Sequence, residues 1–385
     1  MSRLASISLS PELQVLLECA RVHEDPSALR AALGCVTDWG RLRDVALHHG
    51  MLPLVCRRVK STCPDAVPPD FLEDIGRFYR ANSLRNLRMT VALFKIVDGL
   101  SARGVRAAPV KGPLLAEYVY GDIGLRQIED LDILVGSADY GCARDLLLGD
   151  GYQQFGGTAY GPPPAHQMFR FEGRGEVVEL HGRMAPALPH DSFSAERLLA
   201  RARPATLLGR EVLSISPEDL FLLLCLHGMK HRWARVELSC VIGALLAKNV
   251  VTDWRGILQD AWAGRCLRRL LIAAVLAREV TGVALPAELD AAVIENDVAS
   301  YLAHQICVAS PEGGPQGAPT GLRGALWEAM SLDTAGASLR RFVSIACTPN
   351  PEDKGWVSLS PGLSWMYFGI RPVRLVAQNV RRVIG

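Results

Sequence analysis

The sequence predicts an α+β fold in which a small mixed sheet lies between two helical regions. Apolar residues recur at helical spacing over 1–104, the period shortens to that of strands over 105–215, and helical spacing returns over 216–385. We therefore expect an N-terminal helical region, a mixed core and a C-terminal helical region with these bounds. The chain has 385 residues, a length sufficient to bury a core. Its residues are 49% hydrophobic and 21% charged, a composition too apolar for a disordered chain.

Charge and hydropathy exclude several classes of protein. The formal net charge is +2 at pH 7, so the chain lacks the basic field that a large nucleic acid would require. The most apolar runs are about a third of the ~20 residues that a membrane span needs. The ten cysteines form no CxxC pair, which disfavours a zinc site or a disulfide framework. We expect a cytoplasmic protein with no membrane or large nucleic-acid partner.

The two helical regions contain clear helix signals. The run Phe71–Leu100 is apolar on one face and polar on the other, and it stops before Gly104. Ser216 and Pro217 predict the start of a helix over 216–233, because Ser accepts hydrogen bonds from free N–H groups and Pro suits the first helical position. The tail from Trp365 to Ile384 is another amphipathic segment, and we expect Pro372 to break it.

The middle region contains the expected strands. These are Val105–Val110, Gln127–Val135, Gln167–Glu172, Glu176–His181 and Glu211–Ile215. The third and fourth flank the short Gly173-Arg174-Gly175 segment, which predicts a hairpin. The Gly- and Pro-rich segments Gly156–Ala165 and Ser310–Gly321 predict loops.

Three acidic residues on these strands are the main candidates for catalysis and metal binding. Asp130 and Asp132 are separated by one residue, so on a strand both carboxylates lie on one face while Leu131 and Ile133 point into the core. If the strand carrying Glu179 lies alongside, a third carboxylate joins them, as two-metal phosphoryl transfer requires. Mg²⁺ prefers oxygen ligands and would offset the repulsion between the carboxylates. The alternative is a solvated outer face of the sheet.

Two further motifs have the chemistry to bind phosphate. Lys111 and Gly112 lie between a strand and a helix, where a glycine lets the backbone approach a phosphate and a helix N-terminus favours an anion. His227, Lys230 and His231 share one face of the helix over 216–233. We expect Lys230 to face the core and offset the charge of a triphosphate, with His231 nearby. An ordinary turn and a solvated helix face are the alternatives.

Several stretches together resemble a known family. PVKGPLLAEYVYGDIGLRQIEDLDILV, VVELHGRM and CLHGMKHRWARVE are similar to a bacterial family of uncharacterised nucleotidyltransferases in the polymerase-β-like superfamily. The resemblance implies a nucleotidyltransferase core in which Asp130, Asp132 and Glu179 are the metal ligands. It also places Arg126 in an R-x-x-x-D-x-D arrangement, which implies that this arginine pairs with an active-site carboxylate or contacts phosphate.

The resemblance also implies an activity. We expect an enzyme that uses Mg²⁺, with two ions, to transfer a nucleoside monophosphate from a nucleoside triphosphate such as ATP to an acceptor hydroxyl, releasing pyrophosphate. The acceptor would be a small molecule or a peptide, as in natural-product biosynthesis. The alternative is a binding or scaffold protein with weakened catalysis. Lys111-Gly112 stands where the superfamily usually has Gly-Ser, and Val241 stands where the family often has Asp, which motivates that alternative.

Overall fold

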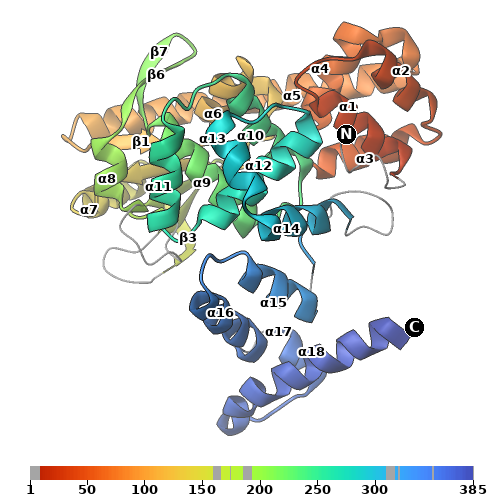
Figure 1. Cartoon of the computed structure of the whole chain (residues 1–385). Coiled ribbons are helices and arrows are strands. Elements are labelled where there is room, and N and C mark those ends of the chain that lie inside the picture. The colour runs from red at the N-terminus through yellow and green to blue at the C-terminus, as the bar shows by residue number, and fades with distance from the viewer. Residues whose placement is uncertain are drawn as a thin grey trace.

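The computed structural model describes residues 9–158, 166–173, 175–184, 193–308, 317–319, 321–348 and 351–384. The chain combines many helices with a five-stranded mixed sheet, which confirms the predicted fold class (Figure 1). The predicted loop Ser310–Gly321 and the second half of the predicted loop Gly156–Ala165 lie largely outside the described residues.

The first four helices gather at one end of the molecule, and the long α5 (Pro69–Ser101) extends from this group to the sheet (Figure 1). The four are α1 (Pro11–Ala20), α2 (Pro26–Gly34), α3 (Trp39–His48) and α4 (Leu52–Thr62), with a short 3-10 helix η2 (Pro64–Ala66). Side chains of Ser10, Asp25 and Asp38 cap the first three helices. The apolar faces of α1 to α4 and the start of α5 form one cluster, which extends to Val236, Cys240 and Val280 of later helices.

The central sheet has the strand order β1-β2-β5-β4-β3. Its strands are β1 (Ala107–Pro109), β2 (Leu131–Val135), β3 (Tyr152–Thr158), β4 (His166–Phe171) and β5 (Val177–His181). Strands β2 and β5 are parallel, and the other neighbouring pairs are antiparallel. The pairing of β4 with β5 confirms the predicted hairpin.

The first part of the predicted loop Gly156–Ala165 is wrong, because Gly156–Thr158 belongs to β3 and pairs with β4. Gly157 has a φ of 134°, and a Cβ on this residue would lie 2.6 Å from the carbonyl oxygen of His166. The glycine therefore permits a close approach of two strands instead of marking the end of one.

Helices cover both faces of the sheet. Leu131 and Ile133 of β2, with Val178 and Leu180 of β5, pack in one cluster with α5 and with α7 (Tyr140–Gly149). Leu134 belongs to a second cluster on the opposite face, which includes the two helices α8 (Ala195–Ala200) and α9 (Pro217–Lys230). The hairpin β6 (Arg203–Leu207) and β7 (Arg210–Ser214), the helix α6 (Gly112–Tyr120) and η3 (Ile123–Leu125) complete this region.

The C-terminal half of the chain is helical. Its elements are α10 (Val236–Ala247), α11 (Trp254–Ala263), α12 (Leu267–Thr281), α13 (Ala287–Ile294), α14 (Asp297–Val308), α15 (Gly321–Met330), α16 (Ala335–Cys347), α17 (Pro351–Trp356), η5 (Pro361–Met366) and α18 (Tyr367–Ile384). Figure 1 shows α15 to α18, in blue, as a group set apart from α1 to α4. The predicted break at Pro372 is wrong, since α18 continues through it. Among the described residues, no helix has both the length and the apolar character of a membrane span.

Candidate active site

Strands β2 and β5 bring two of the predicted carboxylates together. In their parallel register Asp132 lies opposite Glu179. Neighbouring positions on paired strands point to the same face, so both side chains leave the sheet on the side opposite Leu131 and Ile133. The side chain of Asp132 is 1% exposed, whereas that of Glu179 is 14% exposed. The pair is therefore buried, with Glu179 at its solvent side.

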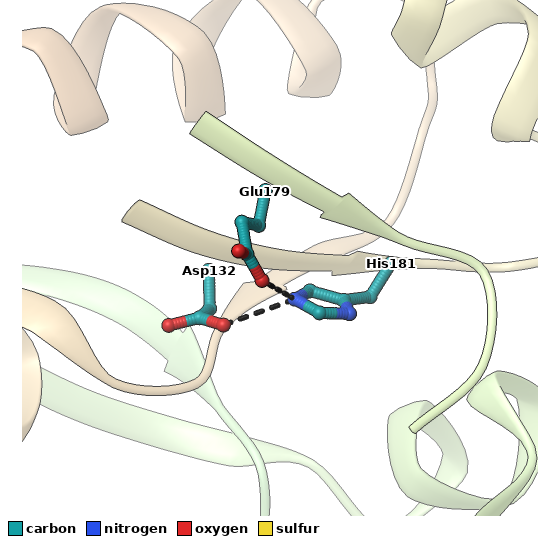
Figure 2. A group of neighbouring side chains, drawn as sticks. All are labelled: Asp132, Glu179 and His181. Carbon is teal, nitrogen blue, oxygen red and sulfur yellow. Dashed lines mark hydrogen bonds and ion pairs between the residues drawn. The ribbon is translucent and has the colours of Figure 1, made fainter. Parts of the chain in front are cut away.

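His181 completes the group of side chains shown in Figure 2. It lies two residues after Glu179 on β5 and therefore shares its face. Its Nε2 atom is 2.9 Å from Oδ1 of Asp132 and 3.4 Å from Oε2 of Glu179. The ring also stacks on that of His166 from β4, with centroids 5.6 Å apart. His181 was not among the predicted site residues, although its alternation with Glu179 along the strand contained the signal.

Lys111 neutralises the other side of Asp132. Its Nζ atom lies 3.0 Å from Oδ2 of Asp132. The residue stands at the start of α6, where Gly112 has a φ of 59°, a conformation that favours glycine. Burial alone would raise the pKa of Asp132, but Lys111 and His181 together hold it below its ordinary value. Asp132 therefore stays ionised in the buried site.

Asp130 lies beside this group, just before β2 begins. The strand begins at Leu131, whereas the sequence predicted a start at Gln127. Asn82 and Asn86 of α5 both donate hydrogen bonds of 2.8 Å to the carbonyl oxygen of Arg126, and these bonds hold the segment before the strand outside the sheet. Burial and the charge of Asp132 raise the pKa of Asp130 to about 6, with Glu179 acting in the same direction. The third carboxylate is thus close enough to repel the other two.

The C-terminal end of α9 contributes positive charge and imidazole groups. The Ser216 side chain accepts a hydrogen bond from the backbone N–H of Asp219, which confirms the predicted cap. Burial lowers the pKa of His227 well below its ordinary value, with Lys111 as the next cause. Burial also lowers the pKa of His166, and Lys230 contributes to that shift. The end of this helix therefore lies near the carboxylates of the sheet.

The position of that helix end depends on the turn after it. Trp233 is buried and folds back onto Gly228, where a Cβ would lie 2.4 Å from its ring. His231 and Lys230 sit between these two residues and are exposed. The glycine thus lets the chain reverse tightly and present both side chains at the surface.

Arg126 occupies a different place from the carboxylate group. Its Nε atom donates a hydrogen bond of 2.8 Å to Oε1 of Glu237 on α10, and the two side chains are 13% and 5% exposed. The second oxygen of Glu237 lies 3.4 Å from Arg235. Arg126 is therefore paired with a carboxylate from the helical region, a contact that spans 111 positions in the sequence.

The residues on β2 and β5 suit a divalent cation. Asp132, Glu179 and His181 each offer one ligand atom, and these atoms all lie within 4.8 Å of one another. Ionised carboxylates and imidazole are common ligands of divalent cations. This compact group does not include Asp130, although the charges of Asp132 and Glu179 interact with that of Asp130.

Comparisons with known proteins place the chain in a family. No curated protein matches it. A solved structure of an antigenic nucleotidyltransferase-like protein from Paracoccidioides brasiliensis is 18% identical, with a TM-score of 0.31, over 51% of this chain and 94% of the other. A likeness at this TM-score supports no conclusion about the present chain. The model of the family described as uncharacterised nucleotidyltransferase matches residues 36–282, and the chain therefore belongs to that family.

Proposed function

We propose that the protein is a divalent-cation-dependent nucleotidyltransferase and that the carboxylates on β2 and β5 form its active site. The observation that carries this proposal is the buried pair of Asp132 and Glu179 at one register position, with Asp130 beside it, in a chain of this family. In the reaction an acceptor hydroxyl oxygen forms a bond to the α-phosphorus of a nucleoside triphosphate. The bond from that phosphorus to the bridging oxygen breaks, and pyrophosphate leaves.

The site carboxylates would hold the cation. Asp132 and Glu179 have oxygens within the compact group, and Asp130 would share a second ion or hold water on the first. Mg²⁺, as two ions, is the choice that carboxylate oxygens alone would favour. A bound cation would offset charge on the phosphates and increase the acidity of the acceptor hydroxyl. One of the carboxylates would accept the proton that this hydroxyl loses.

Positively charged side chains would bind the triphosphate. The ammonium group of Lys111 has three donors and uses one toward Asp132, so the others remain for phosphate oxygens. Gly112 lets the backbone at the start of α6 come close to the same phosphates. Lys230 and His231, at the exposed end of α9, would contact the outer phosphates. Together these contacts orient the triphosphate for attack.

The acceptor would be a small molecule or a peptide that carries a hydroxyl group. The net charge of +2 provides little attraction for a large nucleic acid. A natural-product biosynthetic role in the cytoplasm, with ATP as the nucleotide, is the setting that we propose. The helices around the sheet would select the acceptor, because the carboxylates themselves contact only the reacting groups.

Pyrophosphate release measured with each of the four nucleoside triphosphates and a panel of hydroxyl acceptors tests the proposal. We expect cation-dependent release that is lost in Asp132→Asn and in Glu179→Gln. Asp145→Asn is the matched control, since this carboxylate is exposed on α7 and pairs only with the adjacent Arg144 among the described residues. Equal release by wild type and Asp132→Asn would contradict the proposal. Tight binding of a partner without any need for cation or nucleotide would favour the scaffold alternative instead.

A further inference from the structure

The imidazole of His181 gives the proposed cation site a nitrogen ligand. From the geometry of the site we infer that His181 binds the cation directly through Nε2, and that the site therefore prefers a first-row transition cation such as Mn²⁺ over Mg²⁺. This inference deepens the proposed function and rests on it for the role of the cation.

The spacing of the three ligand atoms supports direct binding. Nε2 of His181 lies 2.9 Å from Oδ1 of Asp132 and 3.4 Å from Oε2 of Glu179. Adjacent ligands around an octahedral cation with bonds of about 2.1 Å are separated by roughly 3 Å. The nitrogen is therefore placed with respect to both oxygens as a neighbouring ligand would be, as the convergence in Figure 2 shows.

A purely hydrogen-bonding role explains less of this arrangement. A ring nitrogen has one proton or one lone pair, so it makes one strong hydrogen bond, whereas Nε2 of His181 faces two carboxylates. Asp132 also has an ion pair to Lys111 through its other oxygen, so the imidazole is not the sole group that compensates its charge. A cation between the three groups would satisfy all of them at once.

The surroundings of His181 leave the group of three ligands accessible. The ring of His166 stacks against that of His181 at an interplanar angle of 23°. The side chain of His181 is 12% exposed, and that of Glu179 is 14% exposed, so both reach the solvent at one side. Lys111 in turn holds Asp132 through its other oxygen, in the manner of the outer partners that orient metal ligands.

The chemistry of the ligands then sets the preference for the ion. Mg²⁺ is a hard cation that favours oxygen ligands and retains its water. Imidazole binds first-row transition cations more strongly, and Mn²⁺ accepts both carboxylate and imidazole ligands. A site with two carboxylates and one imidazole therefore favours Mn²⁺ more than the all-carboxylate site predicted from the sequence would.

Pulsed electron paramagnetic resonance of Mn²⁺ added to the full-length protein, without nucleotide, tests the inference. Nitrogen directly bound to Mn²⁺ modulates the electron spin echo, so wild type should show ¹⁴N modulation and His181→Asn should lose it. His166→Asn is the matched control and should retain the signal. In calorimetric titrations we expect wild type to bind Mn²⁺ more tightly than Mg²⁺, and His181→Asn to reduce the ratio of the two affinities on the order of 10- to 100-fold.

Three results would overturn the inference: bound Mn²⁺ without ¹⁴N modulation in wild type, modulation that survives in His181→Asn, or no Mn²⁺ binding at all. If His181→Asn does not fold, the presence of the signal in both wild type and His166→Asn still supports direct binding, and its absence from both still contradicts it. Pyrophosphate release is measured separately. A protein that shows the nitrogen signal without turnover would contradict the proposed function alone, and one with turnover but no signal would contradict this inference alone.

Discussion

Two clusters of charged side chains, each built around a buried carboxylate, differ in how far acids and bases balance. In the first, Glu237 on α10 is paired with Arg126 through one oxygen and with Arg235 through the other. Arg235 also donates a hydrogen bond of 3.2 Å to Glu129. Two acids thus meet two arginines. We call this group of four side chains the balanced cluster.

The second cluster lies on β2 and β5 and has more acid than base. Asp130, Asp132 and Glu179 face one lysine, Lys111, and the imidazole of His181. Burial raises the pKa of Asp130, and the negative charges of Asp132 and Glu179 raise it further, as an excess of acid requires. Burying unpaired charge costs free energy, so a fold retains such a group when something outside the chain compensates for it. The difference teaches that charge balance, more than burial, separates a structural ion pair from a binding site.

The largest expected effect comes from removing one acid of the site. Asp132→Asn should lower the rate of pyrophosphate release at least about 10³-fold, which corresponds to roughly 4 kcal/mol in the activation free energy. The amide keeps the shape of the side chain but lacks the negative charge that a cation needs. Asp145→Asn should be as active as wild type. Activity of Asp132→Asn within a few-fold of wild type would remove the distinction between the two clusters.

Breaking the balanced cluster should affect stability instead. Glu237→Gln leaves Arg126 buried beside a neutral amide, and we expect the free energy of unfolding to fall by about 3–5 kcal/mol. Urea denaturation measures this loss. The double variant Arg126→Met/Glu237→Met should be less destabilised than Glu237→Gln, because it leaves no uncompensated charge. A loss below about 1 kcal/mol in Glu237→Gln would mean that this pair does not hold α10 to the core.

Acid should weaken the region of the balanced cluster through His49. The carbonyl oxygen of this buried residue accepts a hydrogen bond of 3.2 Å from the N–H of Glu237. Burial, with His48 and Arg235, lowers its pKa from 6.5 to about 4. The unfolded chain therefore binds a proton between these values while the folded chain does not, so stability falls as the pH falls through this window.

The lowered pKa of His49 should reduce the free energy of unfolding at pH 5 by about 2 kcal/mol relative to pH 7.5. His49→Gln should remove this reduction, so the variant should lose less stability than wild type on acidification. Urea denaturation at the two pH values measures the difference, and other titrating groups cancel in the comparison. Equal losses in wild type and variant would show that His49 does not titrate as its burial requires.

The smallest effect is expected at the exposed end of α9. Lys230→Ala should weaken triphosphate binding only a few-fold, or roughly 1 kcal/mol, because exposed ion pairs are screened by water and salt. The weakening should shrink as NaCl is added. Calorimetry measures the affinity for triphosphate and its dependence on NaCl. Lys95→Ala, at an exposed position of α5, is the control. An effect that is equal for the two lysines would place Lys230 outside the site.

The sequence allowed prediction where a local rule decided the structure. The alternation around Asp132 and Glu179 placed both acids on the face opposite the core residues, and the register of β2 with β5 confirms that they meet. Ser216 followed by Pro217 predicted the start of α9, and its capping bond is present. In these cases the period of the backbone and the chemistry of one side chain are sufficient.

Long-range contacts decided what local rules could not. The pairing of Arg126 with Glu237 joins residues that are 111 positions apart, and no spacing in the sequence indicates it. Asn82 and Asn86 hold the segment before β2 outside the sheet, which moves Asp130 off the strand where alternation had placed it. His181 was on the predicted face, but its convergence with two carboxylates depends on the neighbouring strand.

Thermal unfolding with and without a divalent cation tests the central claim most directly, because the same measurement of Tm reports on variants of both clusters. A cation at 100 times its Kd should stabilise wild type by about 2.7 kcal/mol and raise its Tm. Asp132→Asn should show no rise, whereas Glu237→Gln should start from a lower Tm and rise as much as wild type. A full rise in Asp132→Asn, or none in wild type, would contradict the claim that the acidic excess on β2 and β5 exists to bind a cation.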